Sequence, residues 1–304
     1  MKIIANKWFW LAVFVLSWTV AGVAMFSDDT TAITEHGGPC PQRIVAMAPN
    51  LTEILFALGL EDNIVGVTEY SNHPPSARQK PVMGTFWQPN IEAVVAARPD
   101  LVVALGFNRQ AGLAHRLARL NFNTLTVNIE TIPQLLDAIE KIGTVTNKTA
   151  AARRLSERLR NNLDNISRRV AAGHRPKVLY IIQIEPLRVA GRQTFINELI
   201  ELAGGENAIA PTINKYPPVG PEQVIASNPD VIIQPVMDVM EKADLTAGKQ
   251  QLVEYFDRFQ SIAAVSGNRI YVIDGDAVSR LGPRIDQAAE TVARCLSPEL
   301  FEEP

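Results

Sequence analysis

The chain has 304 residues, of which 47% are hydrophobic and 20% are charged, a composition typical of one large or two medium-sized globular domains. Its formal net charge is −3 and its Lys and Arg residues are not clustered. This argues against a nucleic-acid-binding protein, because neutralising phosphates requires grouped basic side chains. The four histidines are dispersed and the two cysteines are far apart, so no metal site is expected.

The N-terminus differs from the rest of the chain. Lys2 and Lys7 precede an uncharged apolar run, and small residues at 22–24 offer a cleavage site. A run of about 19 apolar residues is also long enough to span a bilayer. We therefore expect residues 1–26 to be either a cleaved signal peptide or a membrane anchor, with a flexible leader at 27–42. In both cases the chain is exported, to the periplasm or the cell surface.

From residue 43 onward, short apolar strands alternate with helical patterns. The first helix is expected to begin at Asn50, with Asn50 and Glu53 forming a capping box. The alternation predicts an α/β fold with parallel sheets. We expect two lobes, at residues 43–146 and 174–304, with strands at 43–47, 64–68, 101–105, 124–127, 177–182, 231–234 and 269–273.

An internal repeat supports two lobes. Residues 92–103 and 222–233 both follow the pattern E-x-V-[VI]-A-x-x-P-D and continue with three apolar residues. Each copy reads as a short helix that ends before a proline and leads into a buried strand. The same helix-strand unit is therefore expected once in each lobe.

One long helix is predicted between the lobes, at residues 147–173. Its apolar residues recur every three or four positions, so a single stripe faces inward. A helix of 25 residues is roughly 40 Å long, more than a connector within one lobe needs. It lacks an internal Gly or Pro, and we expect a rigid connection. The stripe consists of Ala152, Leu155, Leu159, Leu163, Ile166 and Val170.

Two α/β lobes leave one cleft between them, and ligand sites in such folds lie at the carboxyl ends of the strands. The loops expected there carry aromatic side chains outside any helical or strand core spacing. We interpret these as an exposed aromatic wall for a ligand. They are Tyr70, Phe86, Trp87, Phe107 and Tyr216.

Cys40 precedes the first strand and Cys295 lies in the last predicted helix. In an oxidising compartment they could form a disulfide between the two chain ends, or remain two thiols. The sequence has no Gly-rich phosphate loop, no G-x-S-x-G and no HExxH motif. We therefore expect a binding protein rather than an exported enzyme, with no cofactor.

Several ordered motifs together resemble one family. They include the segments 43–53, 65–70, 99–103 and 204–207, and the repeat that begins at Glu222. From about residue 43 to 296 the chain is similar to the periplasmic binding proteins of metal-chelate ABC importers. This resemblance implies two α/β lobes on a long helix with little hinge motion, and a small-molecule metal chelate as the ligand. The partner implied is a permease dimer with its ATPase subunits.

Within this family the sequence looks most like the vitamin B12-binding members. That resemblance implies cobalamin as the first choice of ligand, with a ferric siderophore or haem as alternatives. It also implies that Asp276 and Arg280 join the aromatic residues in the ligand site, the alternative being a surface ion pair between the two. A corrinoid has flat apolar faces for aromatic rings and edge amides for Arg and Asp.

The resemblance further implies that Glu92 and Glu222 dock the protein on its permease. They occupy the same position in the two copies of the repeat. A second interpretation is that both carboxylates only stabilise the N-termini of their helices. The two roles are compatible.

Overall fold

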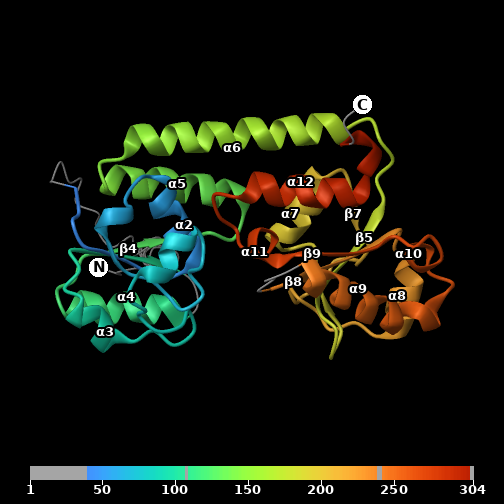
Figure 1. Cartoon of the computed structure of the whole chain (residues 1–304), viewed down its shortest axis with the longest axis horizontal. Coiled ribbons are helices and arrows are strands. Elements are labelled where there is room, and N and C mark those ends of the chain that lie inside the picture. The colour runs from blue at the N-terminus through green and yellow to red at the C-terminus, as the bar shows by residue number, and fades with distance from the viewer. Residues whose placement is uncertain (1–39, 107–108, 238–241, 302–304) are drawn as a thin grey trace, which may run out of the picture. The chain divides into compact units, whose positions relative to one another are not determined.

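A parallel sheet of four strands lies in the first half of the chain in the computed structural model, which describes residues 40–106, 109–237 and 242–301 (Figure 1). The order β2-β1-β3-β4 places the fully buried strands β1 and β3 in the middle. In chain order the elements are β1 (Ile44–Ala46), α2 (Pro49–Ala57), β2 (Ile64–Gly66), α3 (Ile91–Ala96), β3 (Leu101–Leu105), α4 (Arg109–Arg119), β4 (Thr124–Val127) and α5 (Ile132–Val145), with 3-10 helices at Glu61–Asn63 and Pro75–Gln79.

The second sheet is built around β5, which pairs in parallel with β7 and β8 and antiparallel with β6, while β9 lies beyond β8. The predicted fold class, two α/β lobes with parallel sheets, is confirmed. The elements of this lobe are β5 (Lys177–Gln183), β6 (Arg188–Val189), α7 (Phe195–Leu202), β7 (Glu206–Asn207), α8 (Pro221–Ser227), β8 (Val231–Val236), α9 (Lys242–Phe256), α10 (Ala263–Ser266), β9 (Ile270–Asp274), α11 (Gly275–Val278) and α12 (Ile285–Leu296), with 3-10 helices at Asp257–Phe259 and Pro298–Leu300.

The middle strands are apolar at successive positions because both faces of each sheet are covered. In β1, Ile44 and Ala46 belong to one core cluster, whereas Val45 packs in a second cluster on the opposite face. In β5, Val178 and Leu179 divide in the same way. Side chains alternate between faces along a strand, so a continuous apolar run is needed here.

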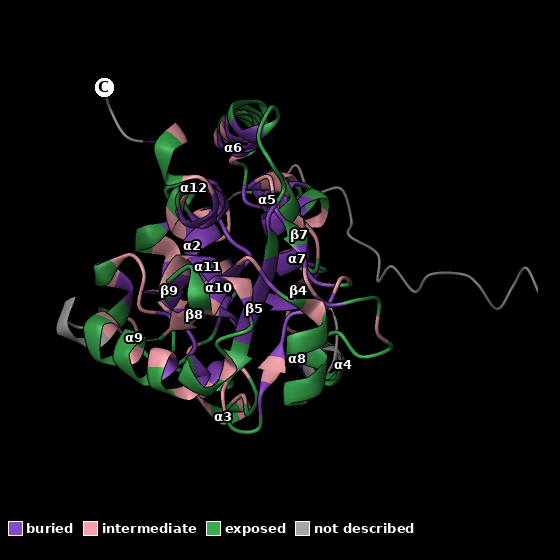
Figure 2. Ribbon diagram, turned by 90° about the vertical axis from the view of Figure 1, so that its right-hand side faces the viewer, coloured by how far each residue is buried: buried purple, intermediate pink, exposed green. Residues whose placement is uncertain are grey.

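The long helix α6 (Thr149–Val170) packs against α5 of the first lobe and against α7 and α12 of the second. The predicted apolar stripe is confirmed, since all six of its residues are buried. In Figure 2 the buried side of α6 faces α5 and α12. The helix begins two residues later than predicted, with Lys148 at the N-cap position. One core cluster includes this stripe together with strands of both sheets.

The two copies of the repeat form the same structure. Asp100 Oδ1 accepts a hydrogen bond from Arg43 N at 3.0 Å, and Asp230 Oδ2 accepts one from Lys177 N at 2.8 Å. Each aspartate thereby holds the start of the central strand of its lobe. The residue before each repeat proline has a positive φ, 46° at Arg98 and 40° at Asn228. The predicted helix-strand unit is therefore present once in each lobe.

The predicted signal peptide or anchor at 1–26, and the leader as far as residue 39, lie outside the described residues. Within the described ranges, no helix combines the length and apolarity needed to cross a membrane.

Candidate functional site

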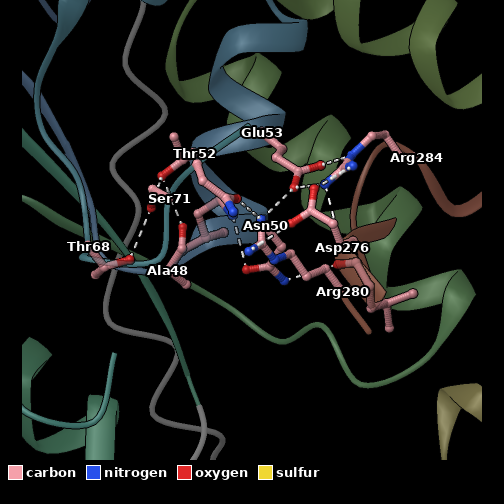
Figure 3. A network of polar contacts seen from close by, with 12 residues as sticks. Ala48, Asn50, Thr52, Glu53, Thr68, Ser71, Asp276, Arg280 and Arg284 are labelled. Carbon is pink, nitrogen blue, oxygen red and sulfur yellow. Dashed lines mark hydrogen bonds and ion pairs between the residues drawn. The ribbon is translucent and has the colours of Figure 1, made fainter. Parts of the chain in front are cut away.

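A buried ion pair joins the two lobes. Glu53 lies in α2 and Arg284 immediately precedes α12. Arg284 Nη2 is 2.6 Å from Glu53 Oε1, and Arg284 Nε donates to Oε2 at 2.9 Å, so the pair is bidentate (Figure 3). The side chains are only 3% and 14% exposed. Burial by itself lowers the pKa of Arg284, but the hydrogen bond and charge of Glu53 outweigh it and the pKa is raised.

Asp276 and Arg280, the predicted Asp-Arg pair, belong to the same network. Arg280 Nη2 lies 3.0 Å from Asp276 Oδ1, and Arg284 Nη1 lies 2.8 Å from Asp276 Oδ2. Arg280 Nη1 also donates to Asn72 Oδ1 at 2.6 Å and approaches Glu53 at 3.5 Å. Arg280 is therefore held among protein partners at 10% exposure, whereas the Asp276 side chain is 24% exposed.

The predicted capping box at Asn50 and Glu53 is wrong. The helix begins at Pro49, because the fixed φ of proline suits the first helical position, and Ala48 is the N-cap without a side-chain bond. Asn50 donates from Nδ2 to Leu281 O at 3.0 Å, and the Glu53 carboxylate accepts hydrogen bonds from Arg284 instead of capping the helix. Sequence reasoning therefore missed Glu53 as a site residue, and its local motif pointed to a different role.

Tyr70 lies in a turn whose backbone is held in place by the hydrogen bonds of the next residue, Ser71. Ser71 is buried and hydrogen-bonds through its hydroxyl to Thr52 at 3.0 Å and Thr68 at 3.1 Å (Figure 3). The Tyr70 side chain is 51% exposed. Two residues later, Asn72 binds Arg280. The turn therefore presents an aromatic ring close in sequence to the ion network, on a backbone that is held in place.

A neighbouring loop carries Phe86 and Trp87. Glu69 N donates to Gly84 O at 3.0 Å, which ties this loop to the Tyr70 turn. Gly84 has φ +85°, and a Cβ there would lie 2.6 Å from Gln88 O, so the turn requires glycine. The two rings are edge to face at 4.6 Å. Trp87 is 62% exposed, whereas Phe86 is half-buried against the core.

Tyr216 comes from a loop of the second lobe and is 36% exposed. Burial, followed by the charge of Glu130 in the first lobe, raises the pKa of its phenol. Lys215 Nζ forms an ion pair with Glu130 Oε1 at 2.7 Å, so this loop touches the opposite lobe. Phe107, the remaining predicted aromatic, lies outside the described residues.

A pocket of about 280 Å³, lined by polar and charged residues, also lies between the lobes, beside this Lys215 contact. Glu198, one of its lining residues, accepts at Oε2 from Ile132 N at 2.7 Å, and burial raises the pKa of the Glu198 carboxyl. The predicted ligand-binding residues do not line it. The lining residues are Glu130, Thr131, Gln134, Arg192, Gln193, Thr194, Glu198 and Lys215.

His73 lies beside the ion network, half-buried. Burial and the positive charge of Arg284 lower the pKa of its imidazole, which favours the neutral form at pH 7. Among the described residues, no group of three or more His, Cys, Asp or Glu side chains is arranged to hold a metal ion.

Of the two alternatives for the cysteines, a disulfide or two thiols, the structure shows two thiols. Cys40 and Cys295 are both free thiols in the structure. Cys295 is buried on α12, and burial raises the pKa of its thiol to about 12. A thiol with so high a pKa is a poor nucleophile, which fits its place in the apolar core.

The two predicted docking carboxylates are exposed. Glu92 and Glu222 lie in the first turns of α3 and α8. Neither forms a hydrogen bond or ion pair with another described residue. In Figure 1, α3 and α8 lie at the bottom of the view, on the side opposite α6.

The chain is similar to known proteins in sequence and in structure. A family model described as periplasmic binding protein matches residues 44–277. The chain is 29% identical over 271 residues to the uncharacterized ABC transporter substrate-binding lipoprotein YvrC of Bacillus subtilis (strain 168), a match covering 86% of this chain and 82% of that protein.

Two solved structures are similar over most of the chain. The periplasmic vitamin B12 binding protein BtuF of Vibrio cholerae has a TM-score of 0.74 at 25% identity, covering 88% of this chain and 100% of that one. A periplasmic heme binding protein from Pseudomonas aeruginosa has a TM-score of 0.72 at 25% identity, covering 85% and 93%.

Proposed function

The chain belongs to the family of periplasmic binding proteins, and on that premise we propose that it binds a metal chelate, cobalamin as the first choice, for delivery to a membrane permease. Proteins of this family bind a substrate for an ABC importer, which comprises a permease and an ATPase, and are not enzymes. The exported location, the permease dimer and the ligand are parts of this proposal.

The observation that carries the proposal is the set of exposed aromatic side chains on fixed turns. Tyr70 and Trp87 come from the first lobe and Tyr216 from the second, each at least 36% exposed. Exposed aromatic rings without covering protein are suited to the flat faces of a large planar ligand. The similarity to a vitamin B12 binding protein supports cobalamin as that ligand.

Asp276 supplies the polar contact in this proposal. It is the most exposed of the four charged side chains in the ion network, and two arginines fix its carboxylate. A fixed carboxylate accepts hydrogen bonds from the amide edge of a corrinoid. Arg280, with less exposure, orients Asp276 and adds a donor.

Haem is the second candidate, because the neutral imidazole of His73 and the phenol of Tyr70 lie on the same turn. Both groups can ligate iron. A ferric siderophore remains the third. The similarity to a heme binding protein supports considering haem beside cobalamin.

The test is titration of the purified exported chain with cyanocobalamin, haemin and a ferric siderophore, followed by visible spectroscopy after removal of free ligand. We expect retained cobalamin bands and heat on calorimetric titration. If the protein retains haemin or the siderophore but not cyanocobalamin, the retained compound becomes the proposed ligand. If it retains none of the three, chelate binding is refuted.

A further inference from the structure

Helices α3 and α8 present the same pattern of exposure to solvent. Residue by residue, positions 94–99 and 224–229 follow the same order of buried, exposed and half-buried classes. Val94 and Val224, at 0% and 1% exposure, anchor the two helices to their lobes. The residue after each anchor is aliphatic and exposed, Val95 at 38% and Ile225 at 42%.

Each of these aliphatic side chains shares a helix face with a docking carboxylate. Val95 follows Glu92 by three residues, and Ile225 follows Glu222 by three. Residues three apart on a helix are neighbours on its surface. Both helices therefore show a carboxylate beside a branched aliphatic side chain.

Packing within the described residues covers Val95 and Ile225 only in part. Each leaves a large part of its side chain exposed, and β-branched residues are weaker helix formers than Ala or Leu. One exposed aliphatic residue is ordinary on a protein surface. Two at equivalent positions of a structural repeat, each beside a carboxylate without a partner among the described residues, call for a shared explanation.

We propose that Val95 and Ile225 form the apolar part of a paired docking surface, together with Glu92 and Glu222, for a permease built from two copies of one chain. This rests on the proposed importer function. Two equivalent patches match a partner that offers the same socket twice. In each socket a basic group meets the carboxylate, and an apolar group packs on the aliphatic side chain and excludes water from the ion pair.

The test uses the full chain without ligand and the importer's permease-ATPase complex in lipid nanodiscs, with binding kinetics measured at several salt concentrations. Val95→Ala with Ile225→Ala should raise the Kd at least about tenfold, through faster dissociation. Val95→Ala alone and Ile225→Ala alone should each raise the Kd by less than the double substitution does, and by similar factors. Glu92→Gln with Glu222→Gln should instead slow association and weaken its salt dependence.

Leu120→Ala is the matched control, since Leu120 is another exposed aliphatic residue, at 52%, outside both helices. It should bind the permease complex as the wild type does. Thermal melting of every variant checks that the folded state is retained, as expected for substitutions at exposed positions.

Wild-type affinity of the Val95→Ala, Ile225→Ala double variant would overturn the inference, whether or not the glutamate variants are weakened. A loss confined to one of the two positions would overturn the two-fold partner. Because docking is measured without ligand, its outcome is separate from the chelate titration. Failure to bind any chelate would refute the proposed ligand class and leave the docking result standing.

Discussion

Glu53 and Arg284 form a bidentate ion pair, at 2.6 and 2.9 Å, between two residues that are 231 positions apart in the sequence. Glu53 lies on α2 of the first lobe and Arg284 precedes α12 of the second, so the pair fixes how the lobes meet. Arg280 approaches the same carboxylate at 3.5 Å. Two guanidinium groups therefore depend on one buried carboxylate.

Glu53→Gln should destabilise the folded chain by about 3 kcal/mol, because removing one partner leaves buried charges uncompensated. Urea unfolding followed by circular dichroism measures this. Glu140→Gln is the control: its pair with Arg160 at 3.2 Å is nearly half exposed on both sides, and its loss should cost less than about 1 kcal/mol. Equal effects of the two substitutions would contradict a special role for Glu53.

Trp87→Ala and Tyr216→Ala should each weaken cyanocobalamin binding by about 1 to 3 kcal/mol, the range for removing a large side chain from a covered contact. Calorimetric titration measures the loss. Tyr255→Ala, which changes an aromatic residue of α9 packed near Arg258, should leave the affinity unchanged. Unchanged affinity in both Trp87 and Tyr216 variants would show that the ligand binds elsewhere.

The lobes should move little when ligand binds. Helix α6 contains no Gly or Pro between Thr149 and Val170, and the Glu53–Arg284 pair adds a second connection. Small-angle X-ray scattering with and without cyanocobalamin should give nearly equal radii of gyration. A clear compaction on binding would show that the connection between the lobes bends.

Stability should fall as the pH drops below about 6.5, in part through His73. Its pKa is lowered in the folded chain from an ordinary value of 6.5, so the unfolded chain takes up a proton that the folded chain does not. This contribution is fully present above pH 6.5 and is lost as the pH falls toward the folded pKa. His73→Gln should flatten the dependence of Tm on pH between 7.5 and 5.

His115→Gln is the control for that experiment, because His115 lies exposed on α4. Its Tm profile should follow the wild type. If the two substitutions flatten the profile equally, the burial of His73 is not the cause.

Glu92→Arg with Glu222→Arg should abolish transport and permease binding while ligand affinity and Tm hardly change. If the carboxylates act only on the helix N-termini, stability falls by about 0.3 to 1 kcal/mol each and transport follows the amount of folded protein. Glu299→Arg changes another exposed first-turn carboxylate and should leave transport unaltered. Transport by the double variant at wild-type levels would exclude the docking role.

The elements that the sequence predicts well depend on local patterns. The stripe from Ala152 to Val170 is buried as expected because helical periodicity reports directly which side faces the core. The repeat was visible because both copies use the same proline, aspartate and strand. Tyr70 and Trp87 are exposed as expected, since their turns lie outside any core spacing.

The ion network was not predictable in this way. Nothing near Glu53 indicates Arg284, because their contact depends on how the two lobes pack. The local sequence predicts a cap for Glu53, whereas Pro49 fixes the start of that helix and leaves the carboxylate free to bind a distant partner. The packing of Phe86 against the core was likewise not predictable from the local sequence, because it depends on the turn at Gly84.

The core cluster that runs through α6 also bears on how this protein can be divided. It contains Ile44 and Leu101 of the first sheet, Leu159 of α6, and Val178 and Val231 of the second sheet. Neither lobe on its own would cover its side of that cluster, so separately expressed fragments would expose apolar surface and aggregate. Chimeras between relatives should therefore exchange loops on an intact scaffold, because a swap of one whole lobe would have to redesign the partners of α6 as well.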